Sequence, residues 1–162
     1  DRGPTANADA PPNAGSDVFT HPLLDLDGRT TNLAAFRGNV TLIDFWGTWC
    51  PACIKGMPHL ARLDREFGPR GLQIVGIAYE EGPPLEQTQR VRFVAQRQSV
   101  NYPLLLGTAQ NCAVLRHYQV TRYPTLVLLD EQGQLLWRGE GLGDANLRRL
   151  EELIRQRLGQ GR

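Results

Sequence analysis

Two almost unbroken apolar runs, VTLIDFW at residues 40–46 and LQIVGIAY at residues 72–79, constrain the fold more than any other feature of the sequence. Such runs are typical of central strands that are covered on both faces. Between them, apolar residues recur at spacings of three and four from Pro51 to about Phe67, and Gly68 follows. We therefore predict two buried strands joined by one helix over residues 51–67.

The remaining patterns add elements around this core. Asp27-Gly28 separates two short segments and predicts an N-terminal β-hairpin. A second hairpin is predicted over residues 125–129 and 134–138. Further helices are predicted over 85–98, over 109–118 and at the C-terminal end, where apolar residues again form one stripe. This order of elements implies an α/β fold, a three-layer α/β/α sandwich around a mixed central sheet.

The first sixteen residues have a different composition. They contain three Pro, two Gly and four Ala, and no side chain larger than Pro that could anchor a core. We predict a disordered arm or tether over residues 1–16 and one domain over residues 17–162. The sequence shows no apolar signal segment, so we expect any N-terminal membrane tether to lie outside it.

Composition excludes several classes of partner. With 162 residues and a net charge of +1, the chain offers no broad basic surface for nucleic acid. None of its apolar runs approaches the roughly 18 residues of a membrane-spanning helix. Three Cys are too few for a disulfide scaffold.

Two of these cysteines, Cys50 and Cys53, directly follow the first apolar run and open the predicted helix. The free N–H groups and the positive dipole at a helix N-terminus stabilise a thiolate, so we expect the pKa of Cys50 to fall below the roughly 8.5 of a free thiol. Cys50 is therefore the expected nucleophile. Cys53, one turn into the helix, can attack Cys50 and is the expected resolving thiol.

Metal binding is the alternative for such a pair. A structural zinc site needs four ligands, and Cys112 with the three histidines supplies no second paired spacing. Copper remains open, because thiolates favour Cu(I) and His59 lies on the same predicted helix. We expect no metal and no other cofactor.

The segment LIDFWGTWCPACIKGMP at residues 42–58 resembles the active-site region of thioredoxins, in particular the extracytoplasmic thiol:disulfide oxidoreductases of the TlpA/ResA type. Trp49 precedes the first Cys, and Pro58 follows the second at the position of a helix kink. Tyr123-Pro124-Thr125 resembles the family's cis-proline loop. The resemblance covers residues 18–158 and implies a thioredoxin-like fold.

The resemblance also implies a substrate-binding surface. Pro124 would be cis and face the cysteines, so that the backbone of Tyr123 can pair with an extended segment of a substrate protein. Trp49 and Pro51 would lie on the same surface. The alternative is that Pro124 only ends a loop before an edge strand.

Two acids are further candidates for the catalytic site. Asp44, in the first apolar run, matches a buried acid of thioredoxin that could take the proton of Cys53. Alternatively, backbone donors satisfy it. Glu81 matches an acid that ResA-type proteins hold near their cysteines, and Glu80 takes its place if the register is off by one. Glu81 is otherwise a solvated loop acid.

Two positions depart from the family. Pro51-Ala52 replaces a pair that often ends in Pro, and this dipeptide helps to set thiol pKa and reduction potential, so the redox direction cannot be transferred. Gly56 replaces an acid common in this helix and lowers its propensity by about 1 kcal/mol relative to Ala.

The leading functional hypothesis is a periplasmic or otherwise extracytoplasmic reductase of protein disulfides, with cytochrome c maturation as one role that the resemblance suggests. Its expected partners are disulfide-containing proteins and a membrane or soluble reductase as electron donor. The alternatives are a disulfide oxidase or isomerase and a copper- or haem-handling module. A peroxidase is disfavoured because Thr48 lies only two residues before Cys50.

Overall fold

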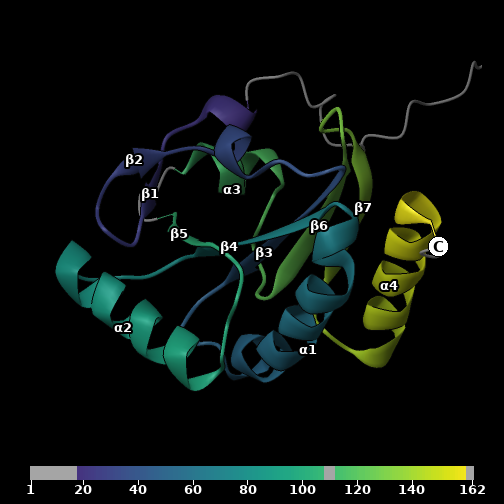
Figure 1. Ribbon diagram of the computed structural model, residues 1–162. Helices are drawn as coiled ribbons and strands as arrows, with labels where there is room; N and C mark the ends of the chain where they lie inside the picture. Colours follow the sequence, from purple (N-terminus) through teal and green to yellow (C-terminus); the bar gives the residue numbers. More distant parts are fainter. Residues whose placement is uncertain (1–17, 108–111, 160–162) are drawn as a thin grey trace, which may run out of the picture.

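The computed structural model describes residues 18–107 and 112–159, in which a seven-stranded sheet lies between two layers of helices (Figure 1). The arm predicted over residues 1–16 lies outside the described residues. The arm and the domain boundary therefore remain predictions.

The sheet is mixed, as predicted. Its central strands β3 and β4 are parallel, and β4 is also parallel to β5, whereas the other neighbouring pairs are antiparallel. The spatial order is β2-β1-β5-β4-β3-β6-β7. The strands are β1 (Leu23–Asp25), β2 (Thr30–Thr31), β3 (Val40–Trp46), β4 (Leu72–Ala78), β5 (Leu104–Leu106), β6 (Thr125–Asp130) and β7 (Leu135–Glu140).

Helices cover both faces of this sheet, which confirms the three-layer prediction (Figure 1). Residues of α1, α2 and α4 form one core with the sheet, and residues of α3 and two short 3-10 helices form the other. The helices are α1 (Pro51–Phe67), α2 (Pro84–Arg97), α3 (Ala113–His117) and α4 (Asp144–Leu158), with 3-10 helices at Val18–Thr20, Leu33–Phe36 and Gly68–Arg70. No helix in residues 18–107 and 112–159 is long and apolar enough to cross a membrane.

The alternation of side chains along β3 assigns its residues to the two cores. Leu42 and Trp46 belong to the core under α1, and Ile43 and Phe45 belong to the opposite one. Asp44 therefore faces α1. Strand β3 thus places the Asp44 carboxyl group on the same face of the sheet as Cys53.

Two expectations about elements differ from the structure. Strand β5 was not predicted, because three leucines after Pro103 are too short a run to show a strand period. The helix expected over 109–118 is a five-residue helix that begins at Ala113, and its expected first residues, up to 111, lie outside the described part. Gln119 follows with a φ of 52°, a left-handed conformation that ends the helix.

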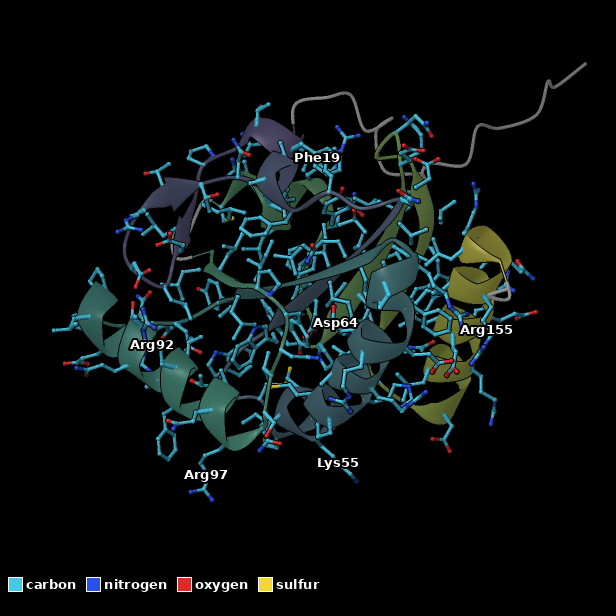
Figure 2. All side chains as sticks on the ribbon, in the orientation of Figure 1. Phe19, Lys55, Asp64, Arg92, Arg97 and Arg155 are labelled. Atoms are coloured by element: carbon cyan, nitrogen blue, oxygen red, sulfur yellow. A yellow bond between two sulfur atoms is a disulfide. The ribbon has the colours of Figure 1, made fainter. Side chains whose placement is uncertain are left out.

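The charged face of α4 contacts α1 as well as solvent. Arg155 pairs with Glu66 of α1 at 2.9 Å, and Glu151 accepts from Arg62 of α1 at 3.0 Å. Figure 2 shows Arg155 where α4 lies beside α1. These ion pairs connect α4 to α1 in addition to the apolar packing between the two helices.

Candidate active site

Cys50 and Cys53 form a disulfide at the N-terminus of α1, with their Cα atoms 5.3 Å apart (yellow bond in Figure 2). Cys50 is the residue that caps the helix, and its Sγ accepts a hydrogen bond from the Cys53 amide at 3.2 Å. Pro51 occupies the first helical position, where its missing N–H costs nothing. The backbone N–H of Cys53 therefore points at the sulfur that the sequence analysis proposes as nucleophile.

The two sulfurs differ in access. Cys50 is 6% exposed and Cys53 is 1% exposed. Next to them, Pro51 is exposed and the Trp49 side chain is 52% exposed, which makes it one of the few large apolar groups on the surface. A partner can thus approach Cys50 across Trp49 more readily than it can reach Cys53.

The loop before β6 lies against this motif. The peptide bond between Tyr123 and Pro124 is cis, in agreement with the resemblance. The Tyr123 ring makes an edge contact with Trp49 at 5.1 Å between centroids and stacks on Tyr79 at 6.0 Å. The Trp49 indole N–H in turn donates to the Tyr79 carbonyl at 2.8 Å. Three aromatic side chains therefore bridge the cis-proline loop and the dithiol.

Asp44 is buried on the sheet face that α1 covers. Its exposed fraction is 1%, and neither carboxyl oxygen has a hydrogen-bond partner among the described residues. The alternative that backbone donors satisfy this acid is therefore wrong. Burial raises the pKa of Asp44 to about 7. The carboxyl group can exchange a proton near neutral pH, as an acid–base group for Cys53 would need to.

Two more buried polar groups belong to the same core. Tyr102 is 5% exposed, and its hydroxyl has no hydrogen-bond partner among the described residues, nor has the Trp46 indole N–H. Burial raises the pKa of Tyr102, and the negative charges of Asp44 and Asp64 raise it further. The sequence analysis did not predict that Tyr102 joins Asp44 and Trp46 in this core, since Tyr102 belongs to the segment before the unpredicted strand β5.

The acid after β4 is shifted by one residue from its expected place. Glu81 is exposed, whereas Glu80 is 3% exposed and accepts from the Thr48 backbone N–H at 2.6 Å and the Thr48 hydroxyl at 2.8 Å. β4 ends at Ala78, one residue earlier than predicted, and the chain then directs Glu80 inward. Glu80, the alternative for a register that is off by one, is therefore the buried acid that contacts the dithiol loop, whereas Glu81 is an exposed loop acid.

An open pocket of about 710 Å³ lies beside this loop. Trp49, Tyr79 and Glu80 are among the residues that line it. The other lining residues are Thr48, Glu81 and Arg90. The pocket offers a partner protein both an aromatic surface and polar groups within a few residues of Cys50.

Cys112 does not join the dithiol. It is a free, buried cysteine that lines a separate pocket with Tyr79 and Tyr123. No group of three or more His, Cys, Asp or Glu side chains that could hold a metal ion occurs within residues 18–107 and 112–159. His59, the histidine considered for copper, instead lies 3.3 Å from the guanidinium of Arg62.

Comparisons with known proteins agree with this geometry. The thiol-disulfide oxidoreductase ResA of Halalkalibacterium halodurans is 30% identical over 123 residues, which are 76% of this chain and 66% of that protein, just under two thirds of its length. The fold matches that of a secreted Mycobacterium tuberculosis disulfide oxidoreductase homologous to E. coli DsbE (TM-score 0.69, 16% identity, 88% of this chain and 99% of that one). It also matches a thiol:disulfide interchange protein of the thioredoxin family from Chlorobium tepidum (TM-score 0.66, 22% identity, 90% and 100%). The fold is therefore thioredoxin-like, as the sequence indicated. The family model described as Redoxin matches residues 5–154, and the chain belongs to the Redoxin family.

Proposed function

We propose that this protein is an extracytoplasmic thiol:disulfide oxidoreductase that reduces disulfides in partner proteins. The observation that carries the proposal is the Cys50–Cys53 disulfide at the N-terminus of α1, with the Cys53 amide 3.2 Å from the Cys50 sulfur. The relatives named ResA and the secreted neighbour of the same fold support both the chemistry and the location.

The reaction transfers two electrons to the partner. In the reduced protein, the Cys50 thiolate attacks one sulfur of the partner disulfide, forms a mixed disulfide and releases the first partner thiolate. Cys53 loses its proton and attacks the Cys50 sulfur. The second partner thiolate then leaves and takes up a proton, while Cys50 and Cys53 end as the disulfide. A membrane or soluble reductase must reduce that disulfide again, and cytochrome c maturation is one process with this demand.

Asp44 is the proposed acceptor of the Cys53 proton. It lies on the sheet face that α1 covers, it has no hydrogen-bond partner among the described residues, and its pKa is raised to about 7 by burial. The rate at which the mixed disulfide is resolved is expected to rise with pH through about 7. Asp44→Asn is expected to remove that step from the pH profile.

Trp49, Pro51, Tyr123 and Pro124 form the proposed binding surface for the partner segment. Pro51 and Trp49 are exposed next to Cys50, and the 5.1 Å ring contact joins Trp49 to Tyr123. An extended substrate segment would pair with the backbone at Tyr123 while its disulfide faces Cys50.

Trapping the intermediate tests the proposal. Reduced Cys53→Ser protein, in a Cys112→Ser background, is mixed with insulin as a disulfide-containing protein and analysed by mass spectrometry without reductant. We expect a covalent adduct through Cys50 that dithiothreitol releases, and none with the matched Cys50→Ser/Cys112→Ser protein. An adduct that forms equally without Cys50 would refute the assignment of the nucleophile.

A further inference from the structure

An ion pair joins Arg90 of α2, whose side chain is 41% exposed, to Glu80 in the loop between β4 and α2. The Glu80 side chain is 1% exposed, and its Oε2 lies 3.3 Å from Nε of Arg90 on α2. Because an unpaired charge on a buried side chain is costly, the Arg90 guanidinium is the charge that offsets Glu80 at this position.

Glu80 in turn holds the loop. Its two oxygens accept from the backbone N–H and the hydroxyl of Thr48. Thr48 lies in a turn in which the Cys50 N–H donates to the Gly47 carbonyl at 3.1 Å. Because such a four-residue turn spans less than about 7 Å, the Glu80 charge lies on the order of 10 Å from the Cys50 sulfur.

The two terminal nitrogens of Arg90 contact residues near the start of α2. One terminal nitrogen donates to the Glu81 carbonyl in a very short contact, and the other lies 3.9 Å from Glu86. Arg90 is thus held beside Glu80 by the Glu81 carbonyl in the loop before α2 and by Glu86, one turn earlier on α2.

We propose that Arg90 is a positioning residue that acts through Glu80 to set the reduction equilibrium of the Cys50/Cys53 pair. The negative charge of Glu80 disfavours a thiolate on Cys50, and the positive charge of Arg90 offsets it. Because the thiolate exists only in the reduced protein, its destabilisation favours the disulfide. The inference rests on the dithiol chemistry of the proposed function and holds for either direction of electron flow.

The test is the equilibrium of each variant with reduced and oxidised glutathione in a Cys112→Ser background. It is measured at pH 9, where a cysteine with a pKa of about 8.5 is mostly ionised. Glu80→Gln keeps an acceptor for Thr48 but removes the charge, and is expected to shift the equilibrium toward the dithiol by at least about threefold. Arg90→Gln is expected to shift it toward the disulfide by a similar factor. A threefold change corresponds to about 14 mV, at 29.6 mV for tenfold.

Two further variants separate electrostatics from folding. The Glu80→Gln/Arg90→Gln double variant restores charge balance, so its equilibrium is expected within about twofold of the parent protein. Arg92→Gln removes an arginine of the same helix that pairs with Asp27 instead, and is expected to leave the equilibrium unchanged. Thermal unfolding of each variant shows whether it is folded. If Arg90→Gln does not fold, Arg90→Lys, which keeps the charge, replaces it. The glutathione equilibrium of Arg90→Lys is then expected to equal that of the parent protein.

Shifts of the same sign for the two single charge removals, or no shift in Glu80→Gln, would overturn the inference. If the variants lose thermal stability but their glutathione equilibrium is unchanged, the inference is also overturned. The ion pair between Arg90 and Glu80 would then have a structural role only. A parent protein that forms no reversible disulfide with glutathione would instead overturn the proposed function, so the two failures are distinguishable.

Discussion

Replacing Asp44 by asparagine tests whether a carboxyl group buried without hydrogen bonds makes the stability of the fold depend on pH. Burial raises the pKa of Asp44 from 3.8 to about 7. The folded state therefore keeps the proton more tightly than the unfolded state does. The stability that protonated Asp44 permits is fully present below pH 3.8 and is lost as the pH rises through about 7.

The size of this loss follows from the shift. At 1.36 kcal/mol per pKa unit the complete cost is about 4 kcal/mol, and about 3 kcal/mol of it falls between pH 4.5 and pH 8. Asparagine has the same shape and does not titrate. Between these two pH values, the free energy of unfolding of the wild-type protein should therefore fall by about 3 kcal/mol more than that of Asp44→Asn.

The assay is urea unfolding of the oxidised protein at both pH values, followed by tryptophan fluorescence. Glu131→Gln, which removes an exposed acid of the β6–β7 turn, is the matched control and should follow the wild type. If Asp44→Asn loses stability as steeply as the wild type between pH 4.5 and pH 8, the carboxyl group is not the buried titrating group described here.

Two other changes test packing and thiol assignment. Gly56→Ala adds a Cβ that would overlap the Leu142 side chain, so the free energy of unfolding should fall by about 1 kcal/mol despite the better helix propensity. In a Leu142→Ala background the same change should be stabilising, and denaturation curves that show a gain in both backgrounds would contradict this packing. For Cys112, oxidised native protein should react slowly with a thiol reagent such as DTNB, and unfolded protein should show one thiol, because Cys112 is the free cysteine. Finding no thiol after unfolding would contradict the structure.

The parts of the fold that could be predicted depend on local pattern. β3, α1 and β4 were predicted within a residue of their ends, because the apolar runs are long and Pro51 and Gly68 mark the limits of the helix. The position of Cys50 at a helix N-terminus followed from the same pattern, which is why Cys50 could be proposed as the nucleophile from sequence.

What could not be predicted depends on contacts between distant segments. β5 is recognisable only by its pairing with β4 and β1. Whether Glu80 or Glu81 is buried against the dithiol loop depends on where β4 ends, and a single residue exchanges a buried acid for an exposed one. Gly56 appears costly in the sequence, yet in the structure it makes room for Leu142.

The central claim is that Cys50 and Cys53 form a redox-active pair that works as a reductant. The most direct test is the reduction potential of the pair, measured against glutathione or dithiothreitol in Cys112→Ser protein. We expect a reversible disulfide with a potential near or below the roughly −270 mV of thioredoxin. A value approaching the roughly −120 mV of a strong periplasmic oxidant would contradict the reductase direction, and the lack of any reversible disulfide would contradict the oxidoreductase itself.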